Sequence, residues 1–444
     1  MELASSLWLS TGLPEASLRH LHLDEPAKPI SSSFKLGDVA QAAIGLSALS
    51  AAYFHQLRTG VEQEVSVDSR HAALEFHSEA HYTLDGVKPG SIWDSIAGLY
   101  KTRNGGHVRI HTNFPHHRKG ILGILNIPDT PTVMRPQVQE ALVQWDSIDF
   151  ETEAVRRGMC ATAYRSFDEW NAHPQAEALR GIPPVTLTKI GEAPKRRLTG
   201  GTRPLEGIRV LDLSRVLAGP VAGRTLAAHG ADVLLVTSPH LPALPVLDAD
   251  TSRGKRTTQL DLNTQEGRDK LGELCEEADV FLQAYRPGGL EARGFGVGVG
   301  RPGMVYASLN TWGWDGPWKD RRGFDSLVQT ATGFNADEGA AFGESGPRPL
   351  PMQALDHAAG TVTEGGSWEV RVSLAAVGQW IRSLGRVPVP TEQIDEHVEE
   401  LLVDWEGERK MRALRHAAIM SATPVKVGNA PASLDMHAPE WLPI

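Results

Sequence analysis

The chain has 444 residues, of which 41% are hydrophobic and 22% charged, enough for two or more ordinary folded domains. This composition excludes an extended disordered chain. The formal net charge of −10 argues against a dedicated nucleic-acid-binding protein. Two cysteines, Cys160 and Cys275, are too few for a disulfide scaffold or a cysteine-rich zinc site.

No targeting or membrane-spanning segment is apparent. The N-terminal residues lack the basic start and long apolar core of a signal peptide, and no apolar run reaches membrane-spanning length. The C-terminal residues are not a peroxisomal targeting signal. We therefore expect a cytoplasmic protein that does not bind membranes.

The first half of the chain is mainly helical in pattern. We expect residues 1–35 to form a cap and linker, and residues 183–203, which are basic and carry Pro and Gly, to form a second linker and the domain boundary. Between these linkers the patterns predict a helix at 38–57, a strand at 64–67, a hairpin at 100–113 that turns at Asn104-Gly105-Gly106, a helix pair at 137–157 and further helix at 167–179.

Residues 204–236 contain a complete strand–helix–strand unit. A mostly apolar run at 208–213 is typical of a buried parallel strand, Gly219-Pro220 opens a helix, and residues 232–236 form a second apolar run. Alternating strands and helices continue towards residue 310, which predicts an α/β fold with a mainly parallel sheet. The G-x-G-x-x-G fingerprint is absent, so a plain NAD site is not expected.

The amino-acid sequence of this unit reads PLEGIRVLDLSRVLAGPVAGRTLAAHGADVLLV. It resembles the N-terminal segment of the family III CoA-transferases, the group of carnitine CoA-transferase, formyl-CoA transferase and α-methylacyl-CoA racemase. The resemblance implies a Rossmann-like, mainly parallel sheet domain with a smaller α+β domain. It also implies acyl-CoA and a carboxylic acid as substrates, no covalently bound cofactor, and a dimer.

An internal repeat indicates a rearranged chain order. Gly60–Val67 matches Gly365–Val372, and each copy follows an aspartate and an alanine-rich helix start. Asp38 lies 22 positions before Gly60, whereas Asp356 lies only nine positions before Gly365. By resemblance, 36–182 is a first copy of the C-terminal part of the family fold, 204–355 the CoA-binding domain, and 356–444 a second, shortened copy. Such a chain forms a homodimer or closes on itself as a pseudo-dimer.

Asp356, in ALDHAAG, is the candidate nucleophile, because it falls where the family's catalytic aspartate precedes a helix of small residues. A carboxylate can attack a thioester and form an acyl-aspartyl anhydride. The alternative is that Asp356 only caps its helix, a position that Asp favours. Gly339, Gly343 and Gly346 are candidates for a glycine-rich loop whose N–H groups stabilise the oxyanion.

The CoA phosphates and adenine call for cations and an aromatic surface. Three segments resemble the family's CoA-binding segments: SRGKRTTQLDL, QAYRPGGLEARG, and the turn after the first strand. For any one cation, the alternative is a solvated surface charge. The candidate CoA-binding residues are Arg215, Gly219, Arg253, Lys255, Arg256, Tyr285, Arg286 and Arg293.

One position separates two enzymatic alternatives. The racemases of the group need a histidine where this chain has Phe324, and without it proton exchange at the α-carbon loses one acid/base partner. CoA transfer is therefore favoured over racemisation. The shortened second copy leaves a third alternative open, a degenerate member that binds CoA without turnover or serves as a partner subunit.

Four histidines in HVRIHTNFPHHR, at 107, 111, 116 and 117, raise the question of a metal site. The surrounding alternation predicts a strand, and no nearby Asp or Glu completes a ligand set. The same stretch resembles a motif of this family. We therefore expect no metal ion.

Overall fold

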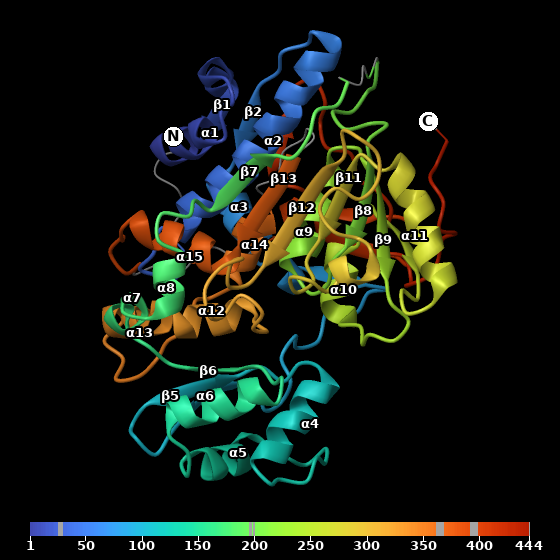
Figure 1. Cartoon of the computed structure of the whole chain (residues 1–444). Coiled ribbons are helices and arrows are strands. Elements are labelled where there is room, and N and C mark those ends of the chain that lie inside the picture. The colour runs from blue at the N-terminus through green and yellow to red at the C-terminus, as the bar shows by residue number, and fades with distance from the viewer. Residues whose placement is uncertain (25–29, 195–197, 199, 361–367, 391–397, 444) are drawn as a thin grey trace.

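The computed structural model describes residues 1–24, 30–194, 198, 200–360, 368–390 and 398–443. Its centre is a seven-stranded sheet with the strand order β10-β9-β8-β11-β12-β13-β7 (Figure 1). Adjacent strands are parallel except that β7 runs antiparallel to β13. In this spatial order the strands are Arg256–Gln259, Asp232–Thr237, Arg209–Leu213, Val280–Gln283, Val305–Asn310, Trp368–Ser373 and Val185–Lys189.

Helices cover both faces of this sheet, because its central strands are apolar on both sides. Val210 of β8 packs in the cluster that contains α9 (Ala218–Ala228) and α14 (Ala354–Gly360). Leu211, the next residue, faces the opposite cluster with α11 (Gln265–Glu277). Successive side chains of a strand point to opposite faces, so one short strand supplies two cores. The expected α/β fold is confirmed.

The remaining helices lie around this sheet and in a smaller lobe. They are α1 (Glu2–Ser10), α2 (Leu36–Thr59), α3 (Ser69–Glu75), α4 (Pro115–Ile124), α5 (Arg135–Leu142), α6 (Ser147–Arg156), α7 (Phe167–Asn171), α8 (Pro174–Ala178), α10 (Pro245–Thr251), α12 (Asp325–Ala331), α13 (Phe334–Ala341) and α15 (Leu374–Ser383), with 3-10 turns η1 (Glu15–His20), η2 (Ser78–Ala80), η3 (Glu291–Arg293) and η4 (Glu399–Leu401). In the described part of the chain, no helix combines the length and apolarity needed to cross a membrane.

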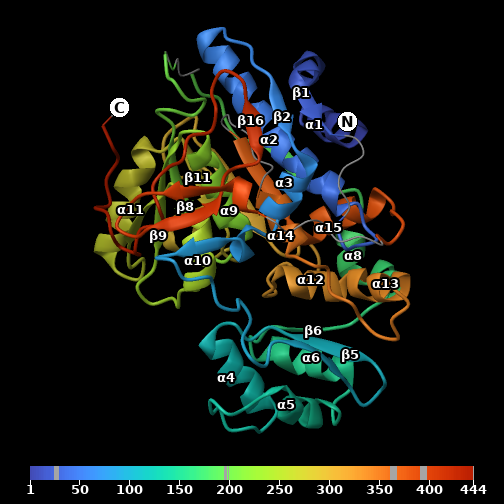
Figure 2. The ribbon, with the colours of Figure 1, turned by 180° about the vertical axis from the view of Figure 1, so that it is seen from behind.

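A smaller α+β lobe projects from the large part, at the bottom of Figures 1 and 2. Its antiparallel sheet consists of β4 (Gly98–Lys101), β5 (His107–Ile110) and β6 (Ala161–Ala163). α4, α5 and α6 cover the sheet and share a separate apolar core with it. The predicted hairpin is confirmed, since β4 and β5 pair across residues 102–106.

The observed boundaries differ from the expected ones because the two copies share one core. β7 falls within the expected linker 183–203, yet it forms the edge strand of the large sheet. β13 belongs to the second copy and pairs with β12 of the CoA-binding segment. α2 of the first copy packs in the same apolar cluster as α14 and α15. Parts of both expected linkers, 25–29, 195–197 and 199, lie outside the described residues.

Two further sheets join the ends of the chain. β1 (Leu21–Leu23) and β2 (Val65–Val67) pair with β16 (Ala418–Met420), and β3 (Tyr82–Leu84) pairs with β15 (Met411–Leu414), next to β14 (Leu402–Trp405). Figure 2 shows β16 beside β2. Strands of the first copy are thus completed by strands more than 300 residues later in the same chain.

The internal repeat corresponds to a repeated strand–cap–helix unit. Asp68 follows β2 and caps α3 by accepting from the N–H of His71, and Ser373 ends β13 and caps α15 by accepting from the N–H of Ala376. The preceding helices differ, with 24 residues in α2 and seven in α14. Gly365, the glycine of the second copy, lies outside the described residues.

Candidate active site

The large sheet has a topological switch point between its neighbouring strands β8 and β11. From β8 the chain proceeds to β9 and β10 on one side, and it then returns to β11 on the other side. Ligands of open α/β sheets bind at such a point, outside the carboxyl ends of the strands. The loop after β8 carries Arg215 and leads into α9, and the loop after β11 carries Tyr285 and Arg286.

Gly219 lets these two loops come close together. A Cβ atom at this position would lie 2.4 Å from the Cβ of Ser214 and 2.9 Å from the Cβ of Ala284, closer than side-chain carbons approach. Ser214 follows β8 and Ala284 follows β11, so the glycine lies between the two loops. It therefore lets the two loops of the switch point pack against each other.

Three arginines and two histidines gather at this switch point: Arg215, Arg286 and Arg322, which we call the switch-point cations, and His116 and His117. Burial, followed by the charges of His116 and the three arginines, lowers the pKa of His117 to about 3. The Nη1 of Arg322 donates to the Nε2 of His117 over 2.8 Å. Such a concentration of positive charge favours binding of an anion.

The individual arginines differ in how they are held. Arg215 is half-buried, its Nη2 donates to the carbonyl of Pro242, and its guanidinium carbon lies 4.9 Å from the ring centre of Phe114 in the small lobe. Arg286 is exposed, and its side chain has no hydrogen bond or ion pair within the described residues. Arg293 is exposed and donates to Gly289 and Asn263. Of the three, Arg286 is the one free for a ligand.

Sequence analysis found Arg215 and Arg286 but missed His116, His117 and Arg322 as their neighbours. The two histidines lie at the start of α4 in the small lobe, and Arg322 lies just before α12. The only sequence signal for the two histidines was the HTNFPHHR motif, which was considered as a metal site. The only signal for Arg322 was the similarity of residues 306–325 to a family segment. Only the docking of the small lobe brings them to the switch point. Within the described residues, no group of three or more His, Cys, Asp or Glu side chains is arranged to hold a metal ion.

Three of the cations expected to bind the CoA phosphates instead form ion pairs within the fold: Arg253, Lys255 and Arg256. Arg253 and Lys255 lie in the turn before β10, and Arg256 is the first residue of this strand, level with Leu234 of β9. Arg253 donates to Asp250 over 2.7 Å, and Arg256 contacts both carboxylate oxygens of Asp232 at 2.9 Å.

Lys255 is the most deeply buried of these three cations. Its side chain is completely buried, and its ammonium donates to Asp212 over 2.7 Å and to the carbonyl of Pro220 over 2.8 Å. Asp212 lies in β8 and is also completely buried. A buried carboxylate requires a compensating charge, so this pair serves the fold. Each of the three cations therefore has a carboxylate partner within the fold.

Asp356 lies in the first turn of α14 and pairs with a second aspartate. Asp325, the first residue of α12, accepts through Oδ2 from the N–H of Leu355 over 2.8 Å and from the N–H of Asp356 over 2.9 Å. Asp325, and not Asp356, therefore caps the start of this helix, which answers the helix-cap alternative for Asp356. Burial raises the pKa of Asp325 to about 6.

The carboxyl group of Asp356 is 8% exposed and lies in an acidic surrounding. Burial, followed by the negative charges of Asp325 and Glu79, raises the pKa of Asp356 well above its usual range. Glu79 lies on η2 and meets the Nε2 of His357 at 3.2 Å. Burial raises the pKa of Glu79, but the hydrogen bond with His357 and the charges of His357 and His77 together outweigh burial and leave the pKa lowered. Strongly perturbed carboxyl groups of this kind are typical of functional sites.

Close packing places α14 beside the switch point. A Cβ atom at Gly360 would lie 2.6 Å from the carbonyl oxygen of Ala218, where α9 begins. On the other side, Phe324 directly precedes Asp325 and stacks on His111 of the small lobe, with ring centres 3.7 Å apart and planes 7° apart. The His117 ring centre lies 6.1 Å from that of Phe324. The aspartate pair and the switch-point cations therefore border the same junction.

The proposed glycine loop is only partly a loop. Gly339 lies inside α13, so it was wrongly assigned to a loop. A Cβ atom there would lie 2.1 Å from the carbonyl oxygen of Gly346, which explains the glycine by close packing. Gly343 has a φ of +69° and ends this helix.

Neither cysteine competes with Asp356 as a nucleophile. Burial raises the pKa of Cys160 to about 12 and that of Cys275 to about 12, so both remain thiols at neutral pH. Cys160 contacts the Nε2 of His117 at 3.6 Å, but a buried neutral thiol is inert.

Comparison with known proteins identifies related sequences. The model of the family "CoA-transferase family III" matches residues 11–195 and 205–368. The chain is similar to acetyl-coenzyme A transferase nodX of Hypoxylon pulicicidum, with 29% identity over 65% of this chain and 55% of that protein. It is also similar to an acyl-CoA transferase of Gibberella moniliformis, with 28% identity over 69% of this chain and 60% of that protein.

The similarity to solved structures is partial. The crystal structure of the hypothetical protein Rv3272 from Mycobacterium tuberculosis shares 31% identity, with a TM-score of 0.36, over 41% of this chain and 58% of that one. The chain spans little more than half the length of the two curated fungal relatives.

Proposed function

Since the chain belongs to CoA-transferase family III, we propose that it transfers CoA between an acyl-CoA and a carboxylic acid. The observation that carries this proposal is the junction at which a buried aspartate pair meets five cationic or imidazole side chains. The cations suit the phosphates of CoA, and a carboxylate suits attack on a thioester. Neither half of the junction alone would support the reaction.

In the proposed reaction, a carboxylate oxygen of Asp356 attacks the thioester carbonyl carbon, the C–S bond breaks, and CoA leaves as the thiolate. CoA thiolate then attacks the aspartyl carbonyl of the resulting acyl-aspartyl anhydride, which releases the donor acid as a carboxylate and leaves an aspartyl-CoA thioester. The acceptor carboxylate attacks this thioester, so that CoA thiolate leaves and an anhydride of Asp356 with the acceptor forms. CoA thiolate attacks the acceptor carbonyl of that anhydride, which gives the new acyl-CoA and regenerates the carboxylate of Asp356, so atoms and charges balance.

For CoA binding we propose Arg215 and Arg286, supported by His116 and Arg322, as the groups that face phosphate. Tyr285, half-buried after β11, offers a ring for the adenine, and Arg293 lies on the same loop. Arg286 is the main candidate because it is exposed and, among the residues that the structure describes, makes no side-chain hydrogen bond or ion pair that a phosphate would have to replace.

Replacing Arg286 with glutamine should weaken CoA binding by about tenfold or more, because a charge-assisted hydrogen bond to phosphate contributes about 1.5–3 kcal/mol. The affinity of the variant should also depend less on salt. Isothermal titration with CoA at two salt concentrations measures both effects. Arg103→Gln, an exposed arginine of the small lobe, is the matched control. Unchanged CoA affinity in Arg286→Gln would exclude this residue from the site.

We propose that a single chain completes the site. His116 comes from the segment matched at 11–195, whereas Arg286 and Asp356 come from the segment matched at 205–368. The intrachain pairing of β2 with β16 supports a self-closed pseudo-dimer. Specific activity that does not change on dilution, with a monomer in sedimentation velocity, would agree; a monomer without activity would contradict it.

A second candidate function is CoA binding without turnover, favoured by the raised pKa of Asp356, because a protonated carboxyl group is a poor nucleophile. Racemisation is less favoured, since Phe324 is packed face to face on His111 and offers no base.

The experiment that separates these functions is trapping with hydroxylamine after incubation with a panel of acyl-CoAs, followed by peptide mass spectrometry. We expect a hydroxamate on Asp356 that is absent from Asp356→Ala. CoA binding without any modification would instead support the binding-only function. A hydroxamate on Asp38 would assign the chemistry to the first copy.

A further inference from the structure

A cavity of about 210 Å³ lies at the C-terminal end of α9, whereas the switch point lies at the N-terminal end of this helix. The last turn of α9, the turn before β10, the segment between β15 and β16, and the loop 424–428 line the cavity. α9 begins beside α14 and ends at the cavity. On this helix the cavity lining begins at Arg224, six residues after Ala218, so about 9 Å of helix separates the two places. The cavity is therefore distinct from the candidate active site.

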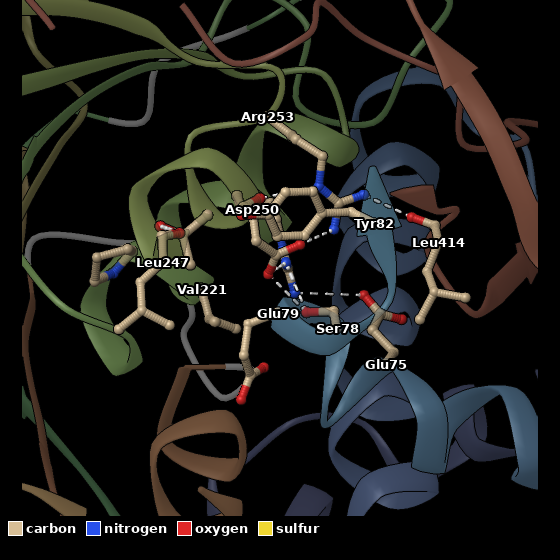
Figure 3. Close-up of polar contacts among 12 residues, drawn as sticks. Glu75, Ser78, Glu79, Tyr82, Val221, Leu247, Asp250, Arg253 and Leu414 are labelled. Atoms are coloured by element: carbon tan, nitrogen blue, oxygen red, sulfur yellow. Dashed lines mark hydrogen bonds and ion pairs between the residues drawn. The ribbon is translucent and has the colours of Figure 1, made fainter. Parts of the chain in front are cut away.

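The wall of the cavity contains a compensated set of charges. Arg224 and Arg253 both pair with Asp250, and Glu75 accepts from the Nδ1 of His416 at 2.9 Å. Figure 3 shows Asp250, Arg253 and Ser78 turned toward one another, with Glu75 nearby. The positive charges of Arg224 and Arg253 are thus compensated by two carboxylates, those of Asp250 and Glu75. This part of the wall therefore needs no further ion to neutralise it.

The outer lining adds positive charge that nothing in the described chain compensates. Arg415 and Lys426 both line the cavity and are exposed. Within the described residues, neither side chain has an ion pair or hydrogen bond. Arg203 already donates to the carbonyls of Ala227 and Ala228, so the negative end of α9 is neutralised. The cavity therefore favours an anion.

Apart from Thr225 and two glycines, the rest of the lining is apolar or aromatic, which a small inorganic anion would not require. Its larger members are Trp405, Leu414, Ile419, Pro424, Val425 and Val427. The guanidinium of Arg253 lies 4.8 Å from the ring centre of Trp405 and holds this ring in place. An engineered apolar cavity of about 150 Å³ accommodates benzene, so 210 Å³ suits a benzene ring that carries one further small group.

Two buried polar atoms of the lining residues are without partners. The indole Nε1 of Trp405 and the Nε2 of His416 have no hydrogen bond within the described part of the chain. Buried polar groups are nearly always paired in folded proteins, and unpaired ones call for an explanation. Both residues line the same cavity, which marks it as a place completed by another molecule.

We propose that this cavity is a second binding site, for a small aromatic carboxylate. The ring would lie against Trp405 and the aliphatic side chains, and the carboxylate would face Arg415 and Lys426. One negative charge suits two exposed cations, and a planar ring suits the size and apolar lining of the cavity. This site does not depend on the proposed transfer activity.

Saturation-transfer difference NMR with the full chain and benzoate tests the site. We expect saturable benzoate binding, and weaker binding of both benzamide, which lacks the charge, and inorganic phosphate, which lacks the ring. Saturating CoA should leave benzoate bound. Displacement by CoA, or equal binding of benzamide or phosphate, would overturn the proposal, as would the absence of saturable benzoate binding.

Variants locate the binding. The double variant Arg415→Gln/Lys426→Gln changes only exposed side chains and should weaken benzoate binding at least tenfold. Ala228→Leu should abolish it by filling the cavity. Lys88→Gln, an exposed lysine without a partner in the described residues, should bind benzoate as the unmodified protein does. An unchanged affinity in the double variant, with its melting temperature preserved, would refute the assignment.

Discussion

Asp356→Asn should lower the rate of CoA transfer on the order of 10⁴-fold, because asparagine is no nucleophile and losing a covalent nucleophile has effects of this size. Its affinity for CoA should stay unchanged, since asparagine keeps the shape of the side chain and the cations are untouched. Steady-state transfer with an acyl-CoA and an acceptor acid, together with calorimetric titration of CoA, measures both quantities.

Asp38→Asn is the matched control, because Asp38 occupies the equivalent position at the start of α2 in the first copy. It is half-buried, whereas Asp356 is 8% exposed. We expect this variant to retain activity. If Asp38→Asn were inactive and Asp356→Asn active, the reaction would belong to the first copy, and the acidic surrounding of Asp356 would serve another purpose.

The pH dependence of transfer provides an independent test of Asp356. Its pKa is raised by burial, by Asp325 and by Glu79, so the nucleophilic form accumulates only well above the pH at which aspartate usually ionises. Activity should therefore rise with pH, and Asp325→Asn should shift the rise to lower pH. A profile that is flat from pH 5 to 8 would contradict this assignment.

The same raised pKa has a consequence for stability. The unfolded carboxyl ionises near pH 4, whereas the folded one keeps its proton to higher pH, so the folded state loses stability as the pH rises through this interval. Asp356→Asn removes this loss and should stabilise the protein at neutral pH, but not below pH 4. Urea unfolding at both pH values measures the difference.

Lys255→Met should destabilise the fold by about 3–5 kcal/mol, the usual cost of leaving a buried partner charge uncompensated. Lys255 and Asp212 are both completely buried and 2.7 Å apart, so no water replaces the lost ammonium. The unfolding midpoint in urea or on heating should fall sharply. CoA affinity, measured below the new midpoint, should not change.

The double variant Lys255→Met/Asp212→Asn should recover much of this stability, because the carboxylate that needed compensation is gone. Lys88→Met, at an exposed lysine, should change the unfolding free energy by less than about 0.5 kcal/mol. A Lys255→Met protein of normal stability that no longer binds CoA would return this lysine to the ligand site.

Residues in regular elements were predictable, because their patterns are local. The apolar runs of β8, β9 and β12 predicted buried parallel strands, and the hairpin β4–β5 followed from its Asn-Gly-Gly turn. Arg215 and Arg286 were proposed because their segments resemble the CoA-binding segments of the family, and the structure places both in loops that follow strands of the parallel sheet.

Tertiary structure decided which of the candidate charges are available. Lys255 carries the same charge as Arg286, yet a carboxylate 43 positions earlier in the chain binds Lys255 and no carboxylate of the described chain binds Arg286. Asp325 and Asp356 become a pair only because α12 packs at the start of α14. Sequence patterns report neighbours within a few residues, whereas partners and burial depend on how distant elements pack. By itself the sequence determined the fold class and the loops that carry the candidate site. Only the packing decided which charged side chains of that site are free to bind a ligand.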